Sequence, residues 1–351
     1  MTATNRLFND GWQFCLCDIG TGISSLEGKR WYDVELPHDW LVNDTANLYK
    51  TGEGWYRRNL DCTSGMLSGR VLLNFDGVYM NSTVYVNGRE AGSWTYGYSA
   101  FEFDITDFLR EGINEIMVRV QHEAPNTRWY SGAGIFRDVT LKLRPGTYIR
   151  TNGVYIHSDK QESDWNTEVE TDVVGLAADI RMVMEVIDPY GNVAAAGSLE
   201  ANFGGGEETF STSIANSDPV LWDIDDPMLY TLRISLYSGE ELLDCVSENF
   251  GYRTTEFSPD RGFLLNGREV KMHGVCMHHD LGALGAAMNT AALTRQLRIM
   301  KEMGVNAIRT SHNMPARQLV QLCDEMGLLV DSEAFDMWEK PKTEMDNHRF
   351  F

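Results

Sequence analysis

The sequence predicts a multidomain protein in which two β-sandwiches precede an incomplete parallel α/β unit. Its 351 residues correspond to two or three domains, at about 100–200 residues per domain. Short segments of alternating apolar and polar residues fill most of the chain, and helical spacing of apolar residues begins only near its end. These changes divide the chain into residues 1–145, 146–256 and 257–351.

Residues 1–145 predict a jelly-roll sandwich. Alternation gives a strand one buried and one solvated face, so such strands pack as sheets face to face. Asn87-Gly88 follows one of the alternating segments and is a strong hairpin signal. Short strands with frequent turns and little helical periodicity favour a jelly roll. The strands expected are 71–75, 82–86, 101–105 and 114–120.

Residues 146–256 predict a second sandwich of the immunoglobulin type. Strands are expected at 180–187 and 231–237, with turns at 188–191 and 204–206. Several short strands in a domain of about 100 residues are typical of this fold.

Residues 257–351 predict alternating strands and helices. A buried strand is expected at 271–275, followed by strands at 305–309 and 328–331. A first helix spans 289–303 and ends at Gly304, and a second begins at Pro315 and ends at Gly327. The inner faces of these helices are expected to carry Leu293, Leu297, Met300, Met303, Leu319, Leu322, Cys323 and Met326.

This order of elements predicts a parallel sheet, because parallel strands need crossover connections. Three strands are too few to close a (β/α)₈ barrel, which takes about 250 residues. The third segment is therefore expected to be the N-terminal part of a TIM barrel.

Composition excludes some classes of function. The formal net charge of -21 argues against a nucleic-acid partner, which requires a basic face. The six cysteines lack metal-ligand spacing, so we expect reduced thiols and no zinc site. No signal peptide or membrane-spanning stretch is visible, which predicts a cytoplasmic protein without a membrane partner.

The order of the predicted domains, together with several motifs, resembles family 2 glycoside hydrolases of the β-galactosidase type. The resemblance covers essentially the whole chain, and its most specific part is NAIRTSHNMP at 306–315. The other matching segments are 31–40 (WYDVELPHDW), 54–57, 75–78, 85–88, 129–137 (WYSGAGIFR), 221–222, 226–232, 274–280 and 282–285.

The resemblance implies a retaining enzyme that hydrolyses terminal β-linked sugars, most typically β-galactosides, with β-glucuronides and β-mannosides as alternatives. Such enzymes use two glutamates, which in this family follow the fourth and seventh barrel strands. The Asn-Glu pair at 114–115 falls in the jelly roll. We therefore expect no catalytic residue within the chain, both glutamates beyond Phe351, and an inactive chain when alone.

The resemblance also implies that the rim of a sugar site is present, because barrel enzymes place functional residues at the carboxyl ends of strands. Arg309 would lower the pKa of the nucleophile, and His312 and Asn313 would bind sugar hydroxyls. Each has a structural alternative, such as an ion pair or a satisfied loop residue. The expected substrate-binding residues are Arg309, His312, Asn313, His279, Asp280, Glu333, Asp336, Trp338, Arg128 and Trp129.

The sequence departs from the family pattern after the third strand. Ser332 replaces the usual aspartate, and Met337 and Glu339 stand where several relatives have a cation ligand. We therefore assign no metal and no cofactor to this chain, and the resemblance leaves magnesium or sodium open for a full-length relative. The expected partner is a carbohydrate, and a homo-oligomer is left open.

A second hypothesis is a non-catalytic module for carbohydrate binding or oligomer assembly. It rests on the jelly roll, whose residues Trp94, Tyr96 and Tyr98 would form an exposed aromatic surface. A packed hairpin end is the structural alternative for these three side chains.

Overall fold

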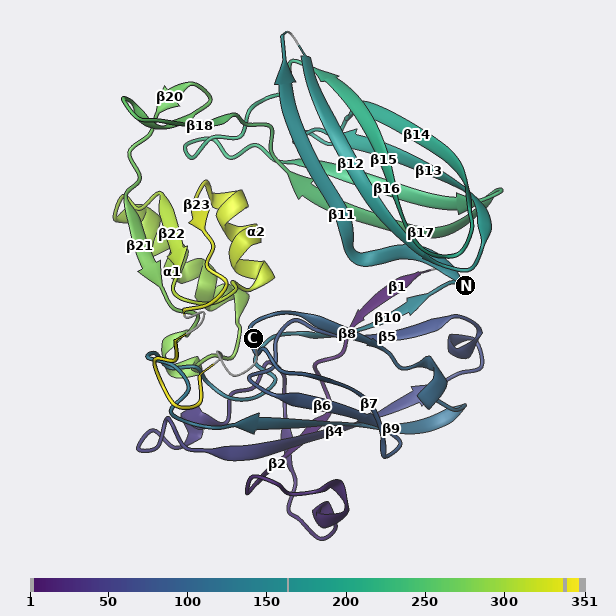
Figure 1. The fold of residues 1–351 in the computed structure, drawn as a ribbon, viewed down its shortest axis with the longest axis vertical. Coiled ribbons are helices and arrows are strands. Elements are labelled where there is room, and N and C mark those ends of the chain that lie inside the picture. The colour runs from purple at the N-terminus through teal and green to yellow at the C-terminus, as the bar shows by residue number, and fades with distance from the viewer. Residues whose placement is uncertain (1–2, 163, 337–339, 347–351) are drawn as a thin grey trace.

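The computed structural model describes residues 3–162, 164–336 and 340–346. Within these ranges the chain forms two β-sandwiches and a smaller α/β part that lies beside them (Figure 1). The sequence-based fold class is confirmed in each of these parts. Among the described residues, no helix has both the length and the apolar composition needed to cross a membrane.

The jelly roll contains a four-stranded and a six-stranded sheet. The first has the order β1-β10-β5-β8 and the second the order β3-β2-β4-β9-β6-β7, with antiparallel neighbours. The strands are β1 (Thr4–Leu7), β2 (Trp12–Cys17), β3 (Tyr32–Val34), β4 (Gly52–Cys62), β5 (Arg70–Phe75), β6 (Ser82–Val86), β7 (Arg89–Trp94), β8 (Phe101–Asp104), β9 (Gly112–His122) and β10 (Val139–Arg144). Short 3₁₀ helices connect them: η1 (Ile23–Leu26), η2 (Leu41–Asn43), η3 (Met66–Ser68) and η4 (Thr106–Phe108).

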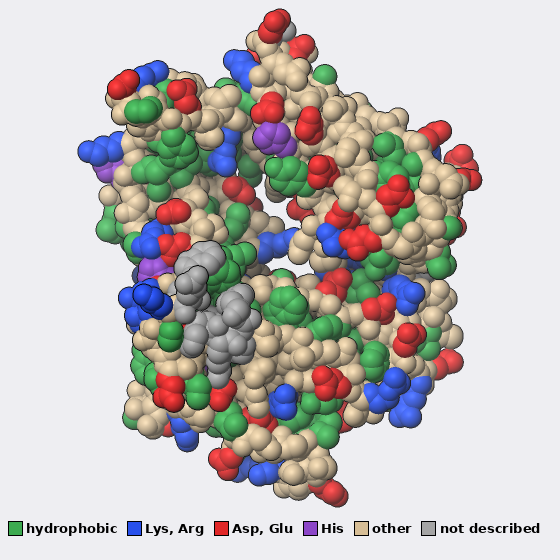
Figure 2. Space-filling view, in the orientation of Figure 1, with side chains coloured by type: hydrophobic (Ala, Val, Ile, Leu, Met, Phe, Trp, Pro, Cys, Tyr) green, Lys and Arg blue, Asp and Glu red, His purple; other side chains and the backbone are tan. Residues whose placement is uncertain are grey.

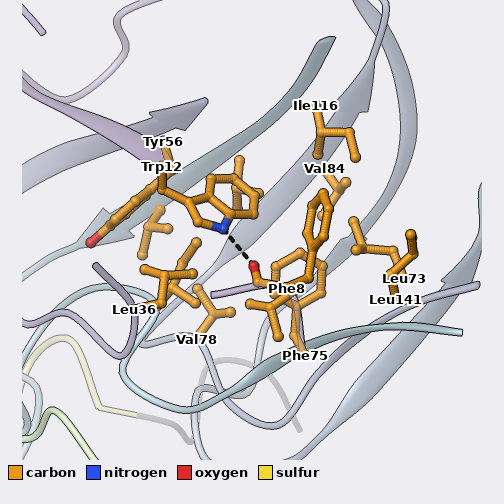
Figure 3. Close-up of a cluster of buried hydrophobic side chains, with 14 of the residues drawn as sticks. Phe8, Trp12, Leu36, Tyr56, Leu73, Phe75, Val78, Val84, Ile116 and Leu141 are labelled. Atoms are coloured by element: carbon orange, nitrogen blue, oxygen red, sulfur yellow. Dashed lines mark hydrogen bonds between the residues drawn. The ribbon is translucent and has the colours of Figure 1, made fainter. Parts of the chain in front are cut away.

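The two sheets enclose an aromatic core. Trp12, Tyr56 and Phe75 are fully buried in it, and the Trp12 indole donates a 2.7 Å hydrogen bond to the Phe8 carbonyl (Figure 3). A buried indole N–H needs such a partner, so the bond allows a large ring to fill the core. The β6–β7 hairpin turns at Asn87-Gly88, as the sequence predicts, and both residues have the positive φ of a type I′ turn.

The immunoglobulin-like sandwich packs sheet β11-β12-β15 against sheet β14-β13-β16-β17. Its strands are β11 (Thr147–Gln161), β12 (Asp164–Gly175), β13 (Ala178–Ile187), β14 (Val193–Phe203), β15 (Gly206–Ser217), β16 (Tyr230–Ser238) and β17 (Glu241–Phe250). Every second residue is buried from Ile180 to Val186 in β13 and from Tyr230 to Leu236 in β16, which confirms the predicted alternation. The domain boundaries after residues 145 and 256 stay predictions, because a domain is defined by its ability to fold alone.

The α/β part begins with a small antiparallel sheet and continues as a parallel one. The first sheet contains β18 (Thr255–Ser258), β19 (Gly262–Leu265) and β20 (Arg268–Glu269); the second contains β21 (Gly274–Met277), β22 (Ala307–Thr310) and β23 (Leu329–Asp331). Between the parallel strands lie η5 (Gly282–Leu284), α1 (Thr290–Glu302) and α2 (Arg317–Met326). Both α-helices bury their inner residues against one face of the sheet.

Three details of this part differ from the sequence-based expectation. The buried strand expected at 271–275 is wrong: β21 starts at Gly274, and Lys271 and His273 are exposed. The Asn306 side chain binds the carbonyl of Lys271 and the amide of His273, and so takes the place of strand pairing there. The other two differences concern helix ends: Met303 is 73% exposed because it is the C-cap of α1, and α2 begins at Arg317 rather than at Pro315.

Acidic side chains are distributed over all three parts of the visible face (Figure 2). This distribution agrees with the net charge of -21 and with a solvated surface. The six cysteines are all free thiols.

Candidate functional site

The loops that follow β21, β22 and β23 meet at one edge of the parallel sheet, as expected for the carboxyl ends of barrel strands. An open hollow of about 640 Å³ lies beside the last two loops and the jelly roll. Five of the predicted site residues line it. Its lining consists of Arg128, Arg309, His312, Ser332, Glu333, Ala334, Phe335, Asp336 and Lys342.

Arg309, His312 and Glu333 form a connected cluster at the centre of this edge. The Arg309 Nε donates to Glu333 Oε1 at 2.5 Å, and its Nη2 contacts the same oxygen. The other oxygen, Oε2, lies 2.6 Å from His312 Nδ1. Burial alone would raise the pKa of Glu333, but the hydrogen bonds and charges of His312 and Arg309 outweigh it and lower the pKa. Glu333 is therefore an ionised acceptor at neutral pH.

An aromatic wall from the jelly roll borders the cluster. The Trp129 ring stacks on His278 at 5.7 Å and 10°, and lies edge-on to His312 at 5.6 Å. His278 also donates from Nδ1 to the Ser311 carbonyl at 2.6 Å. His278 thus belongs to the site's geometry although sequence reasoning selected its neighbour His279. The sequence signal that could have selected His278 is the alternation of buried and exposed side chains along a strand: Met277 is buried at the end of β21, so the next side chain points to the other face.

His279 and Asp280 are not among the residues that line the hollow. His279 turns toward the jelly roll, where its Nε2 donates to the Ser131 carbonyl at 3.0 Å and its ring contacts Tyr98 and Phe136. Burial lowers the pKa of His279 to about 3, so the ring is neutral. The geometry of His279 is that of a packing residue between domains. Asp280 is half-buried, and its carbonyl accepts from the Gln296 side chain at 3.5 Å.

Asn313 is buried next to the cluster. Its amide nitrogen donates to the Met314 carbonyl at 3.1 Å, and its backbone bridges to Phe335. Its Oδ1 is buried without a hydrogen-bond partner among the described residues. In this structure Asn313 therefore supports the loop after β22 rather than lining the hollow.

Asp336 holds two cations at the rim. It forms a two-point pair with Arg128, at 3.0 Å from Nε and 2.5 Å from Nη2, and Lys342 binds it at 2.8 Å. Burial raises the pKa of Asp336, but the hydrogen bonds and charges of these two cations outweigh it, and the pKa is lowered. The pair with Arg128 joins the jelly roll to the loop after β23. The predicted residue Trp338 lies outside the described residues.

Arg137 ties the jelly roll to the loop that carries His312. Its buried guanidinium donates to the carbonyl of Tyr98 at 2.8 Å and to that of Met314 at 2.9 Å. Burial lowers the pKa of Arg137 to about 10, and it still leaves the side chain charged at neutral pH. No carboxylate pairs with it among the described residues, so its bonds to backbone carbonyls are what compensate for burial.

Asp39 makes a second connection between the same two parts. Its carboxylate is buried and accepts from the Tyr130 hydroxyl at 2.6 Å and from the amides of Ala133 and Ala286. Gly285 allows this approach, because a Cβ there would lie 2.4 Å from Asp39 Oδ2. Neither Arg137 nor Asp39 was predicted as part of the site, since the groups that they bind are distant in sequence.

The aromatic surface proposed for a non-catalytic module is not exposed. Tyr98 is fully buried, and Tyr96 is buried and donates its hydroxyl to the Ala334 carbonyl. Trp94 is 39% exposed and stacks on Phe101 at 5.7 Å. The expectation of an exposed platform is therefore wrong, because these tyrosines pack between the jelly roll and the α/β part.

In the described ranges, no group of three or more His, Cys, Asp or Glu side chains is arranged to hold a metal ion. The carboxylates and the histidine that line the hollow are engaged in ion pairs and hydrogen bonds with neighbouring side chains.

Comparison with known families assigns all three parts of the chain. Residues 33–145 match the sugar-binding domain of glycosyl hydrolases family 2, residues 147–253 match the domain described as glycosyl hydrolases family 2, and residues 259–347 match the family's TIM barrel domain.

Relatives are similar over nearly the whole chain. The β-galactosidase BoGH2A of Bacteroides ovatus is 40% identical over 98% of this chain and 42% of its own length. A putative β-glucuronidase of Formosa agariphila is 33% identical over 96% of this chain and 34% of its own length. The chain thus spans less than half the length of these relatives.

Solved structures agree. A glycosyl hydrolase family 2 member from Bacteroides cellulosilyticus superposes with a TM-score of 0.93 at 32% identity, over 99% of this chain and 48% of that one. A β-glycosidase from Bacteroides vulgatus gives a TM-score of 0.90 at 34% identity, over 99% and 46%.

Two β-sandwiches followed by a parallel α/β part, with a polar hollow at the carboxyl ends of its strands, define the architecture of a modular multidomain protein. The chain belongs to glycoside hydrolase family 2. Its relatives in that family are glycosidases.

Proposed function

We propose that this chain is the N-terminal part of a retaining β-glycosidase that releases terminal β-galactosyl residues. The observation that carries the proposal is the Arg309–His312–Glu333 cluster at the carboxyl edge of the parallel sheet. The relative with 40% identity is named a β-galactosidase, which supports this sugar. β-Glucuronides are the second candidate, because relatives with 33% and 31% identity carry that name.

The described carboxylates at the hollow do not fit the two catalytic roles. A general acid needs a raised pKa, whereas the pKa of Glu333 is lowered by its bonds to His312 and Arg309, and that of Asp336 by its bonds to Arg128 and Lys342. A nucleophile needs a free carboxylate oxygen, whereas both oxygens of each carboxylate are already engaged. We therefore propose that the acid/base and the nucleophile come from barrel strands that this chain does not include. The residues of this chain would form one wall of the sugar site.

We also propose a cytoplasmic location, which the six free thiols support.

Hydrolysis of a panel of p-nitrophenyl β-glycosides tests the proposal. The chain of 351 residues and a form that extends through a complete barrel would be assayed on the β-galactoside, β-glucuronide, β-mannoside and β-glucoside. We expect activity only in the longer form, with kcat/KM highest on the β-galactoside. Activity of the short chain that Glu333→Gln abolishes would place a catalytic carboxylate inside it. A preference for the glucuronide would replace the galactosyl assignment.

A further inference from the structure

Glu333 has little capacity left for a sugar. A carboxylate offers about four acceptor positions, and three of them are occupied here. Two lie on Oε1, which accepts from Nε and Nη2 of Arg309, and one lies on Oε2, which faces His312. Its main chain is also fixed, because the Glu333 amide donates to the buried Thr310 hydroxyl at 2.9 Å. Glu333 is therefore held in one position, in which its carboxylate binds Arg309 and His312.

The short contact to His312 decides which imidazole nitrogen carries the proton. Glu333 is ionised and can only accept, so a nitrogen 2.6 Å from its Oε2 must be protonated. The same Nδ1 lies 3.3 Å from Arg309 Nη2, which would favour a bare nitrogen. The carboxylate contact is 0.7 Å shorter (3.3 against 2.6 Å) and involves a full negative charge, so it prevails.

The protonation of Nδ1 sets what the rest of the ring can do. In the neutral imidazole Nε2 is then bare and acts as a hydrogen-bond acceptor. No described residue donates to it, while Trp129 and His278 contact the ring edge-on at 5.6 and 6.0 Å. Since His312 lines the hollow, a hydroxyl group bound there would meet this acceptor.

We infer that Glu333 is a positioning residue that holds His312 as its Nδ1–H tautomer, so that Nε2 of His312 accepts a hydrogen bond from a sugar hydroxyl. The same carboxylate fixes the plane of the Arg309 guanidinium through Nε and Nη2. The sugar hydroxyl in this inference rests on the proposed function, whereas the tautomer does not. A glutamate predicted to contact substrate thus acts through the two side chains that it holds.

The ¹⁵N resonances of the His312 ring test the inference in the 351-residue chain at a pH where the ring is neutral. The His312→Asn variant identifies its signals among the eight histidines. We expect the wild-type ring to be protonated on Nδ1. In Glu333→Gln the single amide oxygen should stay with the permanent cation Arg309, so that the amide N–H₂ faces Nδ1. The proton should then move to Nε2, with a change in the tautomer ratio of about tenfold or more.

Two further variants separate positioning from a general change in charge. Asp336→Asn removes the same charge from the same hollow, but Asp336 binds Arg128 and Lys342 instead of His312. It should leave the tautomer unchanged. Glu333→Asp keeps the carboxylate and should restore Nδ1–H at least in part.

Protonation of wild-type His312 on Nε2 would overturn the inference, and this result does not depend on whether any variant folds. An unchanged tautomer in folded Glu333→Gln would do the same. Neither result bears on glycoside hydrolysis, and a failure of the p-nitrophenyl assay would leave the tautomer assignment standing.

Discussion

Three histidines of the jelly roll and its contact with the α/β part are kept neutral by burial. Burial lowers the pKa of His38 to about 4 and that of His279 to about 3, and it also lowers the pKa of His122. The His38 Nδ1 atom and the Tyr56 hydroxyl form a hydrogen bond of 2.8 Å, in which the tautomer of His38 decides which of the two atoms donates. At these three residues the folded chain takes up protons at lower pH than the unfolded chain does.

This difference predicts a loss of stability in mild acid. Between the unfolded value near 6.5 and the folded value near 4, His38 is protonated only in the unfolded state, so acid favours unfolding. Through His38, the free energy of unfolding is lower at pH 5 than at pH 7.5 by at most about 2 kcal/mol. Urea unfolding should therefore show a shallower pH dependence in His38→Gln than in wild type.

His273→Gln is the matched control, because the His273 side chain is exposed and makes no hydrogen bond or ion pair with the described residues. Its pH dependence should equal that of wild type. Equal slopes for His38→Gln and wild type would show that His38 is not held neutral in the folded chain.

At the scale of elements, the sequence predicted the helices and strands that have a regular spacing of apolar residues. The helices α1 and α2 follow from apolar spacing and from the glycines that end them, and Asn289 caps α1 by accepting from the Ala292 amide at 3.0 Å. The start of β21 was missed because the Asn306 side chain, 33 residues away from His273, replaces its pairing. Such a contact leaves no periodic signal in either segment.

The candidate site was predictable to a similar extent. Residues at the carboxyl ends of parallel strands lie at the same edge of the sheet, and this does not depend on the neighbouring domain. The sequence could therefore predict that Arg309, His312 and Glu333 lie close together. The choice between His278 and His279 depends on the jelly roll, which contributes Trp129 to one and Ser131 to the other. That choice requires the relative position of two domains.

One contact between elements allows a direct test. Lys301 on α1 donates to the carbonyls of Met326 at 2.5 Å, Gly327 at 3.3 Å and Ile224 at 3.1 Å. Its charge thus caps the C-terminus of α2 and joins it to the second sandwich. We expect Lys301→Met to lower the free energy of unfolding by about 1–3 kcal/mol, because buried carbonyls lose a charged donor.

Arg298→Met on the same helix is the control for Lys301→Met. Arg298 is exposed and makes no side-chain hydrogen bond to the described residues, so its replacement should change the unfolding free energy by less than about 0.5 kcal/mol. Equal effects of the two variants in urea would contradict a capping role for Lys301.

At the scale of the whole molecule, the jelly roll holds the three loops of the α/β part. His279 reaches Ser131 from the first loop, Arg137 reaches Met314 in the second, and Tyr96 reaches Ala334 in the third. The contacts to the second and third loops use a backbone carbonyl of the loop, so they constrain its path whatever side chains it carries. The contact of the first loop instead depends on its own His279 side chain. The geometry of the hollow is therefore set from a domain that contributes only Arg128 to its lining.

Arg137 provides the test of this coupling. Gln is too short to span from Tyr98 to Met314, so Arg137→Gln should leave the Met314 carbonyl without its charged donor. Global stability is a poor measure, because the same change removes a buried charge whose burial is itself costly. Local opening of the loop is the better measure, since the Ser311 amide donates to the Met277 carbonyl and the Asn313 amide donates to the Thr310 carbonyl, and both bonds protect the loop from exchange while it is closed.

Hydrogen exchange followed by mass spectrometry should therefore report about tenfold faster exchange in residues 311–316 of Arg137→Gln. The control is Arg70→Gln, in the same sandwich, where an exposed arginine pairs with Asp104 at 3.3 Å. It should leave exchange in 311–316 unchanged. If exchange in this loop is equally slow in both variants, then the α/β part holds the loop unaided, and the jelly roll packs beside the site without shaping it.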